Sequence, residues 1–224
     1  MKRGAGILLS ITSLPSKYGI GCFSKEAYEF VDWLKEAGQS YWQILPVGPT
    51  SYGDSPYQSF STFAGNPYFI DLEALIEEGV LTKAECDAVD FGNKADDIDY
   101  KKMYEGRYLL LRKAYERSDI SKNGEYQRFL VDNRWWLADY ALFMALKDAN
   151  GGVAWLEWDE ALRKRNPEAL EEAMAKYSEE INFWMIMQYL FFKQWKELRQ
   201  YANDRGIEII GDLPIYVALD SVDV

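Results

Sequence analysis

Residues 7–46 read ILLSITSLPSKYGIGCFSKEAYEFVDWLKEAGQSYWQILP, and this stretch decides the fold. The apolar, partly β-branched run at residues 7–11 predicts a strand that is buried on both faces. Ser24 is a suitable N-cap, and apolar residues then recur at helical spacing until Gly38, which predicts a helix with a left-handed C-cap. A second strand is predicted at residues 41–45. Strand, helix and strand with short joints form a βαβ unit, so we expect parallel pairing and a right-handed crossover.

The same order of elements returns near the end of the chain. Apolar residues at helical spacing run through residues 184–201, and Gly206 is placed to end that helix. Residues 207–210 predict a third strand, which Gly211-Asp212-Leu213-Pro214 ends. An open doubly wound sheet and a (β/α)8 barrel both produce this α/β pattern. In both folds the ligand lies beside the loops that follow the carboxyl ends of the strands.

A stretch of different character separates the second strand from the third. From residue 72 to residue 177 the chain is rich in helix formers and has almost no β-branched alternation. Thr82-Lys83-Ala84-Glu85 has the pattern of a capping box, and Asn166-Pro167-Glu168 that of a helix start. We therefore expect a helical insertion between the second and third strands.

Composition excludes several classes of function. The 224 residues include 25 Lys and Arg against 36 Asp and Glu, a net charge of −11, which argues against nucleic acid and anionic membrane partners. The chain has no histidine, so the usual general base and the commonest zinc ligand are both missing. Cys22 and Cys86 match no disulfide framework and no metal-ligand spacing, which favours buried thiols in a reducing cytosol. No signal peptide fits the N-terminus.

The most informative loop is predicted at residues 47–69. Loops of this length are usually either functional or disordered. Six aromatic residues argue against disorder here, because so much aromatic surface is unfavourable in water. The rings alternate with short, uncharged or acidic hydrogen-bonding side chains, namely Ser51, Asp54, Ser55, Gln58 and Ser59. In a carbohydrate site, aromatic rings stack on the faces of a pyranose, and amides or carboxylates form hydrogen bonds with its hydroxyl groups. This combination of residue types suits a neutral carbohydrate. An Ω-loop whose aromatic side chains merely hold it to the protein explains the composition equally well.

Asp212 is a second candidate for a functional residue. It follows a predicted strand at its carboxyl end, from which barrel strands project polar groups into an active site. An Asx-type turn that closes the strand is the structural alternative. The chain has no complete dinucleotide fingerprint and no GxxxxGK[ST] run, so no nucleotide cofactor is expected.

Six short motifs resemble one known family. They are residues 8–16 (LLSITSLPS), 18–21 (YGIG), 41–46 (YWQILP), 48–59 (GPTSYGDSPYQS), 65–68 (GNPY) and 211–217 (GDLPIYV). Together they resemble the 4-α-glucanotransferases, the amylomaltase or disproportionating enzymes of glycoside hydrolase family 77. The resemblance runs from the first strand to the last residue.

This resemblance implies the N-terminal part, about three βα units, of a TIM (β/α)8 barrel with a large helical insertion between strands 2 and 3. Residues 1–71 would hold strands 1 and 2 with the substrate loop, residues 72–177 the insertion, and residues 178–224 a barrel helix and strand 3. The implied activity is transfer of α-1,4-glucan segments, from maltooligosaccharides, starch or glycogen, to an acceptor sugar. It retains configuration through a covalent glucosyl-enzyme and needs no cofactor or metal.

The resemblance also assigns residues. Tyr57 and Gln58 would line the substrate cleft near the scissile bond, and Ser55 and Asp54 would shape that loop. Tyr52 would belong to a secondary glucan-binding surface, and Asp212 would face the donor glucose. The family's nucleophile and acid/base follow later strands, so no catalytic residue is expected in this chain.

Two functions remain open at this stage. The chain is either part of a cytoplasmic glucanotransferase whose remaining barrel is its partner, or a stand-alone, non-catalytic glucan-binding fragment. From the residues alone, without the resemblance, a doubly wound sugar-binding protein with no enzymatic role is a further alternative.

Overall fold

The computed structural model describes residues 3–50, 54–92 and 97–224. Its elements alternate between short strands and helices, with most helices between the second and third strands. In chain order they are β1 (Gly6–Leu8), η1 (Ile11–Ser13), α1 (Lys25–Glu36), β2 (Tyr41–Gln43), η2 (Pro67–Phe69), α2 (Leu72–Glu77), α3 (Lys83–Asp87), α4 (Tyr100–Arg117), η3 (Ile120–Lys122), α5 (Gly124–Ala149), η4 (Trp155–Glu157), α6 (Glu160–Arg163), α7 (Pro167–Lys176), α8 (Ser178–Asp204) and β3 (Glu208–Ile210).

The chain divides into two units. The first contains Met1–Val47, Asn66–Ser118 and Leu190–Leu213, and the second contains Gly48–Gly65, Asp119–Tyr189 and Pro214–Val224. Helix α8 contributes residues 178–189 to the second unit and residues 190–204 to the first.

The three strands of the first unit form a parallel sheet in the order β1-β2-β3. Ile7, Trp42 and Ile209 stand opposite one another in the register, as do Leu8, Gln43 and Ile210. The predicted parallel βαβ unit is therefore confirmed, and the fold class is α/β.

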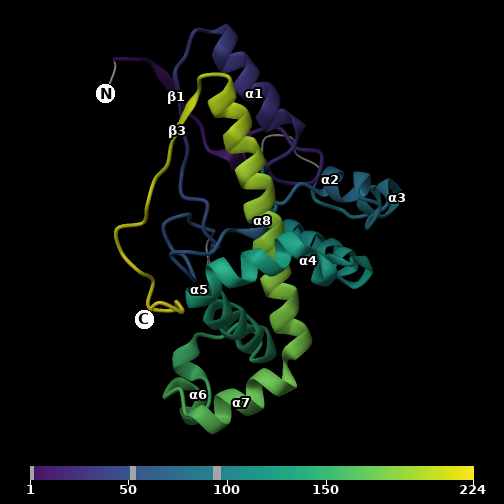
Figure 1. The fold of residues 1–224 in the computed structure, drawn as a ribbon, viewed down its shortest axis with the longest axis vertical. Coiled ribbons are helices and arrows are strands. Elements are labelled where there is room, and N and C mark those ends of the chain that lie inside the picture. Colours follow the sequence, from purple (N-terminus) through teal and green to yellow (C-terminus); the bar gives the residue numbers. More distant parts are fainter. Residues whose placement is uncertain (1–2, 51–53, 93–96) are drawn as a thin grey trace. The chain divides into compact units, whose positions relative to one another are not determined.

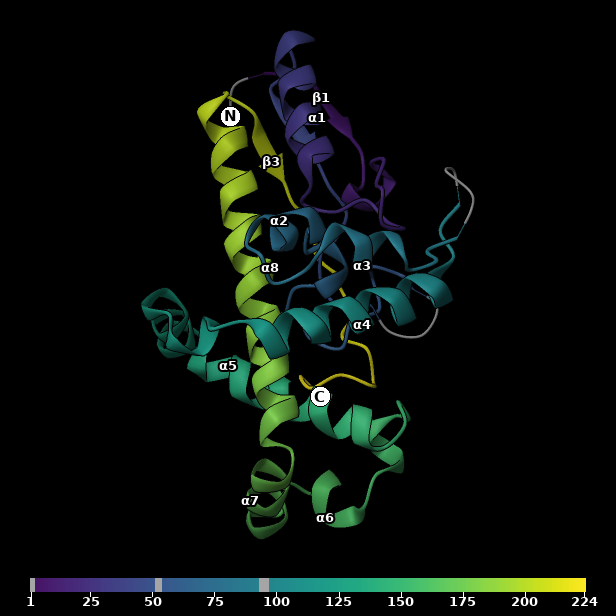
Figure 2. The same ribbon diagram turned by 90° about the vertical axis from the view of Figure 1, so that its right-hand side faces the viewer.

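Helix α1 and the end of α8 lie beside the sheet (Figures 1 and 2). Trp42 is fully buried, its ring meets Phe30 of α1 edge-on at 5.0 Å, and its Nε1 donates to the carbonyl of Leu9 at 2.9 Å. The two helices are joined by Asp32, whose carboxylate accepts from the Tyr201 hydroxyl at 2.8 Å and pairs with Arg205. The row that contains Trp42 is thus the packed face of the sheet.

The opposite face of the sheet corrects one prediction. Residues 7–11 were expected to form a strand buried on both faces, but β1 ends at Leu8, and Ile11 begins a short 3-10 helix. Leu8 is 58% exposed and Ile210 is 43% exposed. Among the described residues only one face of the sheet is covered, because α1 and α8 both pack on the side of Trp42.

An aromatic cluster forms the centre of the first unit beyond the sheet. Phe23 stacks on Phe69 with ring centroids 5.4 Å apart and on Trp195 of α8 at 5.5 Å, and it contacts Phe191 at 5.2 Å. Gln194, buried on the same helix, accepts from the backbone N–H of Asp71 at 2.7 Å. Helix α8 thereby fixes the chain where α2 begins.

The second unit is a helical assembly. Tyr140 of α5 meets Trp184 of α8 edge-on at 6.3 Å, and Tyr126 meets Tyr189 at 5.4 Å. Trp184 Nε1 donates to Asp148 Oδ2 at 3.0 Å. These contacts join α5 and α8, the two longest helices of the described residues, through aromatic side chains.

The predicted helix boundaries are confirmed where a cap or a glycine marks them. Thr82 and Glu85 form the reciprocal capping box, and Asn166 caps α7 with Pro167 in its first turn. Gly38 and Gly206 take φ values of +68° and +78°, the left-handed conformation in which a side chain is disfavoured. Ser24 precedes α1 as expected, but its hydroxyl donates to Glu26 at 2.5 Å and makes no capping bond.

Candidate functional site

The described parts of the predicted loop, residues 48–50 and 54–65, belong to the second unit. Thr50 and Ser59 pair in an antiparallel bridge, and Asp54 at the turn has a φ of +53°. Asp and Asn tolerate this conformation better than most residues because their short polar side chains bond locally. Asp54 does so, since its Oδ1 lies 3.4 Å from the Thr50 hydroxyl.

Four predicted site residues follow one another in this turn. The backbone N–H of Gln58 donates to the carbonyl of Ser55 at 3.0 Å, and the N–H of Tyr57 lies 3.4 Å from Ser55 Oγ. Ser55 therefore organises the turn, while Tyr57, 46% exposed, and Gln58 project from it. Burial raises the pKa of Asp54 above its ordinary value, and the hydrogen bond from Thr50 opposes this shift only in part. Tyr52 lies outside the described residues.

The base of the loop is held by buried polar groups. Ser61 Oγ accepts from the N–H groups of Phe63 and Ala64 at 3.1 and 3.3 Å. Gln188 of α8, fully buried, accepts from the N–H of Gly65 at 2.7 Å and donates to its carbonyl at 2.9 Å. The loop is thus tied down at Gly65, immediately before the chain enters the first unit.

The aromatic residues of this region divide between the two interpretations of the loop. Phe60 packs near Phe143 at 6.4 Å, and Phe63 meets Trp135 edge-on at 4.6 Å, as expected for a loop held to the protein by its rings. Tyr57 is 46% exposed, and an exposed aromatic ring can stack on a sugar. The first observation fits a loop held to the protein by its rings, and the second is compatible with the sugar-binding interpretation.

Asp212 lies in the first unit, two positions beyond the end of β3. Its Oδ1 accepts from the N–H of Leu213 at 2.8 Å, and the residue is half-buried. The carboxylate thus takes part in the local turn that was considered as the alternative to a functional role. The structure brings Asp54, Ser55, Tyr57 and Gln58 together in the second unit and places Asp212 in the first.

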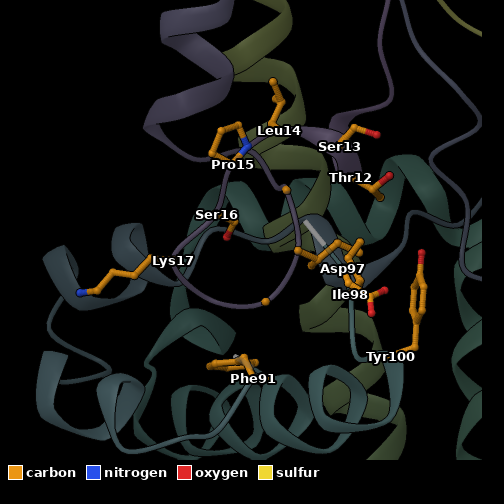
Figure 3. Close-up of a pocket in the computed structure, with 14 residues that line it drawn as sticks. Thr12, Ser13, Leu14, Pro15, Ser16, Lys17, Phe91, Asp97, Ile98 and Tyr100 are labelled. Atoms are coloured by element: carbon orange, nitrogen blue, oxygen red, sulfur yellow. The ribbon is translucent and has the colours of Figure 1, made fainter. Parts of the chain in front are cut away.

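The first unit contains a cavity to which the sequence interpretation assigned no role. Its volume is about 770 Å3, and it is lined by residues 12–17, 19–21, 91–92, 97–98 and 100. In Figure 3 the oxygen-bearing side chains of Thr12, Asp97 and Tyr100 lie together, and Lys17 extends away from them. Lys17 pairs with Asp87 at 3.0 Å.

Two features shape the loop that lines this cavity. A Cβ at Gly21 would lie 2.0 Å from the carbonyl oxygen of Ile11, so the chain can close there only with glycine. Arg107, fully buried on α4, donates from Nη1 to the carbonyl of Tyr18 at 2.9 Å and from Nη2 to the carbonyl of Ile70. A buried arginine is not foreseeable from helical spacing, because its partners are backbone carbonyls distant in sequence.

Metal-binding groups, the two thiols and membrane-spanning helices were the other features to consider in the described residues. Groups of acidic residues and cysteines that could hold a metal ion are absent from the described part of the chain. Cys22 and Cys86 are buried free thiols, as predicted, and burial raises the pKa of both. No helix within residues 3–50, 54–92 and 97–224 is long and apolar enough to cross a membrane.

Comparisons with known proteins agree with the motifs. Residues 9–224 match the sequence model of the 4-alpha-glucanotransferase family. The 4-alpha-glucanotransferase of Clostridium butyricum is 49% identical over 216 residues, which are 96% of this chain and 44% of that protein. That of Thermus thermophilus is 47% identical over 228 residues and is covered to 45%. This chain therefore spans less than half the length of these relatives.

Solved structures agree as well. An amylomaltase from Streptococcus agalactiae in complex with acarbose superposes with a TM-score of 0.93 at 47% identity, over 99% of this chain and 45% of the other. An amylomaltase from Corynebacterium glutamicum, at 19% identity and a TM-score of 0.77, shares the fold. The chain belongs to the 4-alpha-glucanotransferase family.

Proposed function

We propose that this chain forms the N-terminal part of a 4-α-glucanotransferase that moves segments of α-1,4-glucan onto an acceptor sugar. The observation that carries the proposal is the match between this chain and the 4-alpha-glucanotransferase family over residues 9–224. The match includes the loop on which Tyr57 and Gln58 are exposed. Maltooligosaccharides, starch and glycogen are the expected substrates. Cytoplasm is the expected compartment, in keeping with the two buried free thiols.

The fold that fits this function is part of a (β/α)8 barrel. The parallel order β1-β2-β3 supports three consecutive barrel strands, with residues 72–177 as the insertion between the second and third. Residues 1–71 and 178–224 would then supply the barrel portions. A barrel needs eight strands and typically roughly 250 residues before insertions. The remaining strands would be the structural partner of this chain.

The open sheet face supports the same proposal. Leu8 and Ile210 are exposed there in the same row of the register, on either side of Gln43, and a barrel interior is normally filled by such branched apolar side chains. Among the described residues, β1 and β3 are the edges of the sheet and pair with no further strand, so each could pair with another strand of a barrel. Closure of the barrel would bury the apolar face and pair the edges of β1 and β3.

The proposed reaction proceeds in two displacements. A carboxylate attacks the anomeric carbon to give a covalent glucosyl-enzyme, and a second carboxyl group protonates the leaving oxygen and later deprotonates the acceptor hydroxyl. Both carboxyl groups would come from the remainder of the barrel. An acceptor sugar, held on aromatic surfaces, intercepts the intermediate before water does.

Within this reaction the described loop would bind sugar. Tyr57 would stack on a glucose unit near the scissile bond, and the Gln58 amide would bond its hydroxyls. Asp54 and Ser55 hold the turn that presents them. Asp212 would face the donor glucose, and Tyr52 would serve a secondary glucan-binding surface.

A hybrid enzyme tests the proposal. This chain would replace the matching 216-residue part of the C. butyricum 4-alpha-glucanotransferase, with the unaltered enzyme as control. With maltotriose, the folded hybrid should release glucose and longer maltodextrins, whereas the 224-residue chain alone should not. A folded but inactive hybrid would contradict the proposal. Glucose release by the chain alone would contradict the absence of its catalytic carboxylates, and glucan binding without turnover in every form would favour the binding-fragment alternative.

A further inference from the structure

Residues 221–223, near the end of the segment that follows β3, form hydrogen bonds with the proposed sugar-binding loop. Ser221 Oγ and the backbone N–H of Val222 both donate to the carbonyl oxygen of Phe60, at 3.0 and 2.9 Å. The N–H of Thr62 donates to Asp223 Oδ2 at 2.6 Å. Three hydrogen bonds therefore connect residues 221–223 to the loop immediately after Ser59, which pairs with Thr50 in an antiparallel bridge.

That segment is in turn fixed by a buried lysine. Lys147, on α5, is 5% exposed, and its Nζ lies 2.5 Å from Asp220 Oδ2 and 3.2 Å from the carbonyl oxygen of Val153. Asp220 Oδ1 accepts from the N–H of Trp155 at 3.1 Å, and Trp155 Nε1 donates to the carbonyl of Leu219 at 2.8 Å. In Figure 1 the end of the chain lies beside α5.

The same ammonium group also contacts the loop directly. Lys147 Nζ lies 4.7 Å from the centroid of the Phe60 ring, within the range of a cation–π interaction. Lys147 thus contacts the ring of Phe60, and its partner Asp220 directly precedes Ser221 and Val222, which donate to the Phe60 carbonyl. The Lys147 side chain is buried and that of Asp220 is 29% exposed, so the lysine charge is the one that is costly to leave without its partner, and loss of either residue should release the segment.

We propose that Lys147 and Asp220 are positioning residues that fix Phe60 and thereby set the placement of Tyr57 and Gln58. Neither residue is required to touch the sugar. The inference rests on the proposed role of residues 54–58 in binding glucan. It predicts that this ion pair governs substrate affinity more than chemistry, because the groups that form and break bonds lie elsewhere.

Substitutions in the hybrid enzyme test the inference. Lys147→Met retains most of the apolar stem and removes the charge, and Asp220→Asn retains the shape of the carboxylate. Arg165→Met is the matched control, because Arg165 and Asp139 form an ion pair in the same unit at 2.8 Å with side chains 58% and 55% exposed. For maltotriose, each site variant should raise KM about fivefold or more with kcat within about twofold, and the control should change neither.

Two further measurements separate positioning from a general loss of structure. Amide hydrogen exchange in peptides covering residues 54–63 and 219–224 should become about tenfold faster in Lys147→Met, with the first unit unchanged. The double variant Lys147→Met/Asp220→Asn should affect KM no more than the larger single change, as expected for partners in one interaction.

The outcomes distinguish this inference from the proposed function. An active hybrid whose Lys147→Met and Asp220→Asn forms are folded and have unchanged KM would overturn the inference and leave the proposed function intact. Unchanged exchange at residues 54–63 would overturn it even in an inactive hybrid. If Lys147→Met does not fold, Asp220→Asn decides the same questions.

Discussion

The strongest test of how α8 holds the loop is removal of the Gln188 side-chain amide. This amide pairs with both backbone polar groups of Gly65, at 2.7 and 2.9 Å, in a fully buried position. Gln188→Leu keeps a similar side-chain volume but leaves one N–H and one carbonyl without a partner. Each buried group left unsatisfied costs about 1–3 kcal/mol. For two groups we expect the free energy of unfolding to fall by about 2–4 kcal/mol, which is below the upper limit of the sum because water can reach a loosened loop.

Thermal unfolding of the hybrid measures this loss. For a cooperative unit of about 150–250 residues, 1 kcal/mol corresponds to about 2–4 °C, so the unfolding midpoint should fall by roughly 4–16 °C. Gln188→Glu should also be destabilising, because a carboxylate can accept from the Gly65 N–H but cannot donate to its carbonyl. The matched control is Gln200→Leu on the same helix, where Gln200 is exposed and bonds only Asp204 among the hydrogen bonds described.

Two results would refute this reasoning. A midpoint within about 1 °C of the parent for Gln188→Leu would mean that the Gly65 backbone is solvated or paired differently. An equal loss for Gln200→Leu would mean that leucine perturbs α8 itself and that the buried amide has no special role.

Three other predictions concern the sheet, the loop and the stability of the protein at low pH. Trp42→Ala should cost about 3–5 kcal/mol because the indole is fully buried, measured as a lower unfolding midpoint; a cost below about 1 kcal/mol would contradict its place in the core. Tyr57→Ala should slow turnover of maltotriose by the hybrid, mainly through a higher KM because a stacking contact is lost, whereas Tyr52→Ala should mainly weaken binding of long glucans; unchanged kinetics for both would contradict the loop assignment. A hydrogen bond from Lys83, followed by one from Lys17, lowers the pKa of Asp87 from 3.8 to about 2, so its stabilising effect is present above about pH 4 and is lost as the pH falls towards 2. Lys83→Met should return the Asp87 pKa towards 3.8 in an NMR titration, and an unmoved pKa would contradict the pairing.

Local sequence signals predicted the elements well because their causes are local. The capping box at Thr82 and the left-handed glycines at 38 and 206 each act within one helical turn, and the structure has all of them. Strand lengths and burial were predicted less well. Residues 7–11 are apolar enough for a strand buried on both faces, but burial depends on what covers the second face of the sheet.

The candidate site shows the same division. Composition indicated that residues 47–69 combine rings with hydrogen-bonding side chains, and the resemblance supplied the roles. The surroundings of each ring could not be read from the sequence: the Phe60 ring lies 4.7 Å from Lys147 Nζ, while Tyr57 is 46% exposed. Asp212 was equally ambiguous, and its bond to the Leu213 N–H became visible only in the structure.

The sequence by itself determined the family, the parallel βαβ unit and the helical character of the stretch between the second and third strands. These follow from motifs, periodicity and caps, which act over a few residues. The tertiary structure alone decided the partners of the buried polar groups. Gln188 interrupts an apolar helical run, yet its partner Gly65 lies 123 positions away, and Lys147 meets Asp220 across 73 positions. Such pairs depend on the packing that first brings distant segments together, because a buried amide or ammonium group is stable only where that packing supplies its acceptors.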